Sequence, residues 1–127
     1  MLTRLNAPMS GLTPDSEGLI WLDDAATYRQ VMAADVPAEK AAELAAIQQP
    51  IAAAAFGAKV GHAAWRDKPS WYLRTENDNA LPPAVQQTMA QQIRAHITSI
   101  PSSHMSLVSH PDAVVDLIDR AARQAGR

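Results

Sequence analysis

The chain has 127 residues, which suits one domain with a useful core, and its 11 basic and 13 acidic side chains leave a formal net charge of −2. It contains no basic run, no apolar stretch near the roughly 20 residues that span a bilayer, and no cysteine. These features argue against nucleic-acid and membrane partners, and they exclude disulfides and thiolate metal sites. No apolar signal-peptide core follows residue 1, so we expect a cytoplasmic protein.

Residues 1–68 form the first predicted segment, an alanine-rich helical cap (lid). Proline and glycine interrupt its first 18 residues and predict irregular structure there. Asp24 and Pro37 are typical of helix starts, and Pro50 is typical of a helix end. The elements expected in the cap are a short strand at 18–22 and helices at 25–34, 35–49 and 51–60.

Residues 69–127 form the second predicted segment, whose pattern is typical of an α/β fold. The apolar run at 71–73, between a proline and a polar loop, is typical of a buried strand. A helical repeat predicts that Val114, Ile118 and Ala121 face inward in the last helix. The expected elements are strands near 70–75 and 96–100 and helices at 83–95 and 111–125. This order is a βαβ unit with a trailing helix, so the two strands are expected to be parallel.

Two polar loops follow these strands, and they are expected to lie at the same edge of the sheet. Functional loops of an open α/β sheet lie beyond the carboxyl ends of its strands. Asp78 lies in the first loop and His104 in the second. Parallel strands are about 4.8 Å apart, so a carboxylate and an imidazole from neighbouring loops can meet. Such a carboxylate fixes the tautomer of the imidazole and leaves its other nitrogen free to act as a general base.

Other interpretations of these two loops remain open. An aspartate in a polar loop is often a turn former, and a histidine after two serines is often simply exposed. Glu76 is a competing acid in the same loop as Asp78. The matching positions of Asp78 and His104 after two strands favour an acid–base pair. Asp78 is preferred over Glu76 because it comes just before an apolar pair and the helix start.

Several stretches of the chain resemble α/β-hydrolases. The strand and acid loop of that superfamily are matched by residues 68–73, Asp78 and 81–83, and its histidine loop and last helix start by residues 103–111. The cap of its small esterase and hydroxynitrile-lyase branch is matched by residues 6–14 and 18–22. The resemblance implies a partial α/β-hydrolase fold. A helical cap at 1–68 would precede the C-terminal part of the core at 69–127, a βαβα unit with two parallel strands.

By this resemblance, Asp78 is the acid and His104 the base of a Ser-Asp-His triad for ester hydrolysis. Hydroxynitrile lyases of the family carry a lysine directly after that histidine, so Met105 at this position favours an esterase-like hydrolase. The nucleophile of the family lies in a Gly-x-Ser-x-Gly elbow, and none occurs here, since Ser10 lacks the first glycine. We therefore expect the elbow and the oxyanion loop upstream of residue 1, and we expect the chain alone to be inactive.

Substrate contacts are assigned to Met9, Leu12, Trp21 and Met105, although large apolar side chains are also ordinary packing residues. The four histidines lack a metal-binding spacing, so neither a metal nor a cofactor is expected. The expected partners are a small-molecule ester, once the enzyme is complemented, and an N-terminal hydrolase half or a second copy of the chain. The alternative is a non-enzymatic truncated α/β protein or an interaction module.

Overall fold

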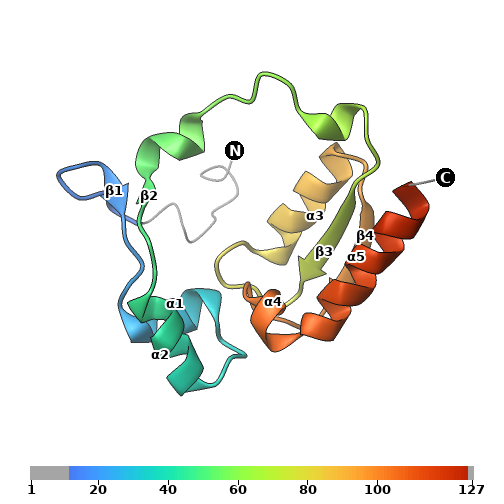
Figure 1. Ribbon diagram of the computed structural model, residues 1–127. Coiled ribbons are helices and arrows are strands. Elements are labelled where there is room, and N and C mark those ends of the chain that lie inside the picture. Colours follow the sequence, from blue (N-terminus) through green and yellow to red (C-terminus); the bar gives the residue numbers. More distant parts are fainter. Residues whose placement is uncertain (1–11, 126–127) are drawn as a thin grey trace.

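The computed structural model describes residues 12–125. It contains two groups of elements, joined by a segment that crosses the top of the molecule in Figure 1. The first group and this segment contain β1 (Leu19–Ile20), α1 (Ala25–Met32), α2 (Ala38–Ala46), β2 (Ile51–Ala52) and the 3₁₀ helices η3 (Ala53–Gly57) and η4 (Ala64–Arg66). The second group contains β3 (Trp71–Thr75), α3 (Pro83–Gln92), β4 (His96–Ile100), α4 (Ser106–Ser109) and α5 (Pro111–Ala125).

Local signals at the helix starts explain α1 and α2. The Asp24 carboxylate accepts a hydrogen bond of 2.8 Å from the Thr27 backbone amide, which satisfies a donor at the start of α1. Pro37 directly precedes α2, where its fixed φ angle is compatible with a helix start. Both predicted helices are confirmed, although α2 ends at Ala46 instead of near residue 49.

The expectation of a helix at 51–60 is wrong. Ile51 and Ala52 form β2, which pairs antiparallel with β1, and the Ala53 amide donates a further 2.9 Å hydrogen bond to the Gly18 carbonyl. Gly18 has a φ of 78°, a left-handed conformation that glycine adopts without steric cost, and it turns the chain into β1. Pairing with a distant strand outweighs the weak helical preference of an alanine-rich stretch, so only the short helix η3 follows.

The second group confirms the predicted βαβα order and the α/β fold class. β3 and β4 are parallel, and they are paired in register from Trp71 opposite His96 to Thr75 opposite Ile100. The two strands run between α3 and α5 in Figure 1. α3 ends earlier than expected because Arg94 adopts a left-handed φ of 54°, which cannot continue a helix. The short helix α4 lies in the loop where the sequence pattern predicts no helix.

The inward face of α5 is only partly as expected. Val114 and Ala121 are half-buried, but Ile118 is 61% exposed, and Leu117 is the buried residue of the helix. The placement of Ile118 inward is therefore wrong. Leu117 and Ile118 both fit a helical repeat that includes Val114 and Ala121. The pattern cannot choose between two adjacent apolar residues, and the packing of α5 against β3 decides between them.

The main buried core lies in the first group and reaches the loop after β4. Its buried members are Leu22, Tyr28, Ala33, Val36, Ala41 and Ala45. Met105, in that loop, and Val108, in α4, pack against this core. Ala33, directly after α1, and Ala41 and Ala45 of α2 are small buried side chains, which allow α1 and α2 to pack closely. The loop that contains His104 is consequently held against the α1–α2 pair.

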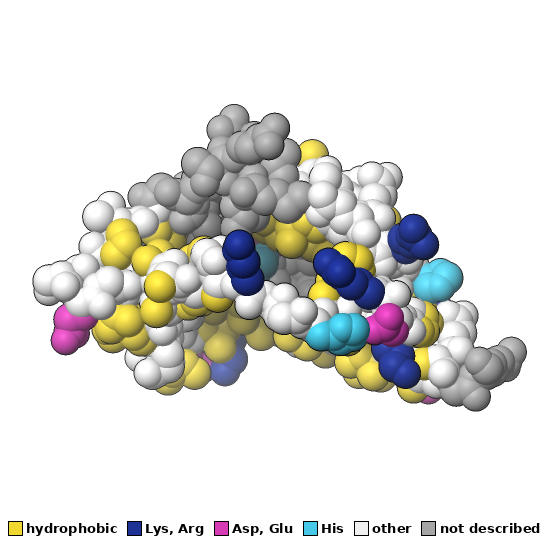
Figure 2. Space-filling model, turned by 90° about the horizontal axis from the view of Figure 1, so that it is seen from above, with side chains coloured by type: hydrophobic (Ala, Val, Ile, Leu, Met, Phe, Trp, Pro, Cys, Tyr) yellow, Lys and Arg dark blue, Asp and Glu magenta, His cyan; other side chains and the backbone are white. Residues whose placement is uncertain are grey.

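Hydrophobic side chains are exposed on the segment that connects the two groups. Phe56, Val60 and Trp65 are 51%, 76% and 43% exposed. Figure 2 looks onto the molecule from the side of this segment and shows hydrophobic surface between single basic side chains. Within residues 12–125, none of the helices combines the length and the apolar character needed to cross a bilayer.

Candidate active site

The ends of β3 and β4 bring the two polar loops together. Beyond the last strand pair, the Asn77 amide donates a 3.0 Å hydrogen bond to the Ser102 carbonyl, which holds the loops side by side. His104 Nδ1 then lies 2.8 Å from Asp78 Oδ2. The predicted contact between these two side chains is confirmed, while their catalytic role stays a prediction.

Five donors surround the buried carboxylate of Asp78. Its Oδ1 accepts hydrogen bonds from the backbone amides of Ala80 and Leu81, at 2.9 and 2.8 Å. Its Oδ2 faces three side-chain donors, from Thr75 at 2.7 Å, Gln86 at 3.0 Å and His104 at 2.8 Å. The bonds to the two amides also form the local turn, so Asp78 shapes its loop and contacts the histidine at the same time. A carboxylate with so many donors is favoured in its ionised form.

The pKa of Asp78 lies below its ordinary value of 3.8. Burial alone would raise this pKa, but the hydrogen bonds from the His104 side chain, the Leu81 amide and Thr75 lower it by more. An ionised carboxylate has no proton to donate, so Nδ1 of His104 carries the proton in their contact. Nε2 has no hydrogen-bond partner within the described part of the chain, and the imidazole side chain is 38% exposed. This is the arrangement of a general base that a carboxylate holds in place.

The lowered pKa of Asp78 predicts a loss of stability in acid. A group whose folded pKa is depressed stabilises the fold fully above its unfolded pKa, near 3.8, and loses this contribution as the pH falls through the folded pKa. We expect the difference in the free energy of unfolding between wild type and Asp78→Asn to be constant above about pH 5 and to shrink at lower pH. Denaturant unfolding at a series of pH values measures this difference.

Gln91→Leu is the control for this pH series, because it changes an exposed side chain that does not titrate. Its effect on the free energy of unfolding should not follow the titration of Asp78. A difference between wild type and Asp78→Asn that stays constant down to pH 2 would contradict the prediction.

Gln86 is a buried residue in α3 that the sequence patterns do not reveal. Its Nε2 lies 2.7 Å from the Leu81 carbonyl, 2.9 Å from Thr75 Oγ1 and 3.0 Å from Asp78 Oδ2. Its Oε1 accepts the Thr75 backbone amide at 3.0 Å. Gln86 therefore connects α3, the end of β3 and the acid loop. The sequence contains one sign of this burial: Gln86 directly follows Val85, a position that the helical repeat places on the inward face.

Glu76, the competing acid, does not contact His104. Its carboxylate is exposed and lies 3.1 Å from Arg74 Nη2. The structure thus brings Asp78, and not Glu76, to the histidine, although both residues belong to one loop.

Three of the four residues predicted to contact substrate are described, and their surroundings differ. Met9 lies outside the described residues. Leu12 is half-buried against the core of the first group, and Trp21 is 44% exposed. Met105 follows His104 in the chain and packs against the same core. Contact of these residues with a substrate stays a prediction.

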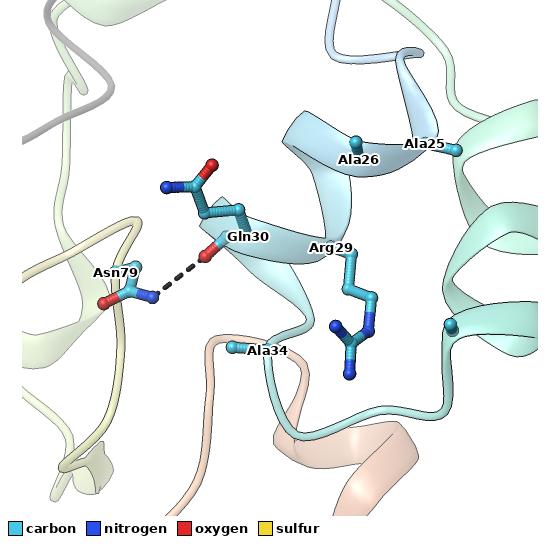
Figure 3. A pocket seen from close by; sticks show the side chains of 7 residues that line it. Ala25, Ala26, Arg29, Gln30, Ala34 and Asn79 are labelled. Atoms are coloured by element: carbon cyan, nitrogen blue, oxygen red, sulfur yellow. Dashed lines mark hydrogen bonds between the residues drawn. The ribbon is translucent and has the colours of Figure 1, made fainter.

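A pocket of about 540 Å³ opens beside α1, near the start of α2 and the acid loop (Figure 3). Its lining residues are Ala25, Ala26, Arg29, Gln30, Ala34, Ala38 and Asn79. The Asn79 side-chain amide donates a 2.9 Å hydrogen bond to the Gln30 carbonyl and ties the acid loop to α1 (Figure 3). Neither Asp78 nor His104 lines this pocket. Over residues 12–125, no group of three or more histidine, aspartate or glutamate side chains is placed to hold a metal ion.

Parallel strands that end in an acid loop and a histidine loop, with the two side chains in contact, are the arrangement that α/β-hydrolases use for the acid and base of their triad. A model of the alpha/beta hydrolase family matches residues 1–117, and the chain belongs to this family. The chain is similar to the alpha/beta hydrolase nvfD of Aspergillus novofumigatus, with 42% identity over 66 residues. The match covers 50% of this chain and 26% of that protein, so the chain spans only about a quarter of its relative.

Proposed function

We propose that the chain supplies the acid and the base of a Ser-Asp-His triad that hydrolyses esters, and that a segment outside these 127 residues supplies the serine. The observation that carries the proposal is the 2.8 Å contact between His104 Nδ1 and the Asp78 carboxylate. The sequence contains no Gly-x-Ser-x-Gly elbow. Ser102 and Ser103 precede His104, but they are 0% and 1% exposed, so a substrate does not reach them.

In this proposal, His104 moves one proton in each half of the reaction. Its Nε2 accepts the hydroxyl proton of the serine while the serine oxygen bonds to the ester carbonyl carbon. Asp78 stabilises the imidazolium that forms. The imidazolium then protonates the leaving alkoxide, which departs as an alcohol and leaves an acyl-serine. Water repeats the sequence: His104 takes its proton, its oxygen attacks the acyl group, and the serine regains a proton as the acid leaves.

The surroundings of Met105 favour ester hydrolysis over hydroxynitrile cleavage. Its backbone amide donates a 3.1 Å hydrogen bond to the Met32 carbonyl, and its sulfur lies 3.6 Å from the Tyr28 hydroxyl. This residue therefore fills space against the core and presents no amino group beside His104. The residue directly after His104 therefore carries no cation, which supports the esterase-like branch of the family.

The test of the proposed function is hydrolysis of a short-chain nitrophenyl ester by the purified chain, alone and mixed with the N-terminal half of a family hydrolase that carries the serine. We expect little turnover by the chain alone, because it lacks the nucleophile, and each missing oxyanion donor removes about 3 kcal/mol of transition-state stabilisation. We expect turnover in the mixture, and a fluorophosphonate should abolish it.

Two outcomes would contradict the proposed function. Fluorophosphonate-sensitive turnover by the chain alone would show that one of its own serines is the nucleophile. A stable complex of the two halves without any turnover would favour the alternative, a non-enzymatic interaction module.

A further inference from the structure

The loop that carries His104 is hydrogen-bonded to the cap on both sides of the histidine. Before it, the Ser103 amide donates a 3.0 Å hydrogen bond to Asp35 Oδ2, and the Ser103 hydroxyl donates to Asp35 Oδ1. After it, the Met105 amide donates to the Met32 carbonyl at 3.1 Å. Met32 ends α1, and Asp35 lies in the turn between α1 and α2. One turn of the cap thus holds both neighbours of His104.

We propose that Asp35 is a positioning residue for His104, whose carboxylate fixes Ser103 so that the imidazole faces Asp78. This inference rests on the proposed function, since it concerns the orientation of the general base. It extends the site to a residue of the cap that touches neither Asp78 nor the imidazole of His104.

The contacts of Asp35 are those of a specific hydrogen-bonding site. Ser103 is 1% exposed, and both of its donors have the oxygens of one carboxylate as partners. Hydrogen bonds to an ionised acceptor are stronger than those between neutral groups. Burial raises the pKa of Asp35, but the bonds from the Ser103 hydroxyl and amide lower it by more, to below its ordinary value. His110, at the start of α5, adds a contact of 3.4 Å from Nε2 to Asp35 Oδ2.

The covalent link between Ser103 and His104 transmits this constraint. The peptide bond between them is planar, so a fixed Ser103 also sets the direction in which the His104 backbone continues. Without Asp35, the buried amide and hydroxyl of Ser103 lose their acceptor, and the loop must shift to find another. A displacement of about 1 Å is enough to lower a catalytic rate by about 10²-fold.

The test is Asp35→Asn in the full chain, with the proton NMR signal of His104 Nδ1–H as the readout. An amide keeps the size of the side chain, but it loses the charge and has one acceptor oxygen for the two donors of Ser103. We expect the Nδ1 proton to exchange with water at least about tenfold faster, the equivalent of one lost hydrogen bond to a charged group. Asp24→Asn is the matched control. It removes the same charge from the same segment of the chain, and asparagine remains a good N-terminal capping residue for α1. It should leave the exchange rate unchanged.

Denaturant unfolding of both variants separates positioning from general stability. A purely structural role would lower the free energy of unfolding of Asp35→Asn and leave the Nδ1–H exchange of the folded chain unchanged, and this result would overturn the proposal. If Asp35→Asn does not fold, Ser103→Ala is the second test of the proposal. It removes the Ser103 hydroxyl bond to Asp35 and keeps the bond from the Ser103 backbone amide. Faster exchange in Ser103→Ala supports the proposal, and an unchanged rate overturns it. If wild type itself has no protected Nδ1 proton, the proposed acid–base pair fails together with this inference.

Discussion

Asp78→Asn and His104→Ala are expected to remove nearly all ester hydrolysis when the chain is mixed with a serine-bearing hydrolase half. When the amide at position 78 donates its N–H group to Nδ1, it favours the tautomer in which Nε2 carries the proton. In that tautomer the imidazole cannot accept a proton from the serine. Loss of the correct tautomer lowers kcat by about 10⁴-fold in a triad of this kind. His104→Ala removes the proton acceptor itself, so its loss should be at least as large.

Glu76→Gln is the matched control for these two variants. Glu76 lies in the same loop as Asp78, but its carboxylate is exposed and lies 3.1 Å from Arg74. Because Glu76 contacts neither Asp78 nor His104, and substitutions at such surface positions change the free energy of folding by about 0.5 kcal/mol or less, we expect a folded variant with kcat within about threefold of wild type. The measurement is kcat and KM for a nitrophenyl ester, with formation of the complex verified for each variant. A loss in Glu76→Gln as large as that in Asp78→Asn would show that the acid is wrongly assigned.

Gln86→Leu is expected to lower the free energy of unfolding by about 3–5 kcal/mol. Leucine is close to glutamine in size, so the loss comes from the hydrogen bonds and not from a cavity. The Thr75 amide and the Leu81 carbonyl lose a partner in a buried region, and Asp78 loses one of its five donors. Each unsatisfied buried group costs about 1–3 kcal/mol. Small domains are stable by about 5–15 kcal/mol in total, so this one substitution removes a large share of the stability.

Urea unfolding followed by tryptophan fluorescence measures this effect, since Trp71 lies in β3, the strand whose last residue, Thr75, contacts Gln86. Gln91→Leu makes the same chemical change on an exposed position of the same helix, and it should alter the free energy of unfolding by about 0.5 kcal/mol or less. A loss below about 1 kcal/mol in Gln86→Leu would show that other groups satisfy the partners of Gln86.

The sequence alone determined the βαβα order of the second group and the meeting of its two loops. A short apolar run at 71–73 and a stretch at 96–100 with two isoleucines and a threonine both fit a pleated strand. The helical repeat between them requires a crossover connection, which makes the strands parallel and puts their following loops at one edge. Asp78 and His104 meet as a consequence of this connectivity. Neighbouring residues in the chain carry these signals, which is why they are readable before any packing is known.

Only the tertiary structure decided the contacts between distant parts of the chain. Residues 51–52 form a strand because β1 offers hydrogen-bond partners. Gln86 is buried because its amide forms hydrogen bonds with the end of β3 and with the acid loop. Asp35 reaches Ser103 across 68 positions of sequence. In each case the stabilisation comes from satisfying polar groups of a remote segment in a buried place. A remote partner leaves no periodic pattern in the residues around it, so neither propensity nor helical repeat reveals these contacts.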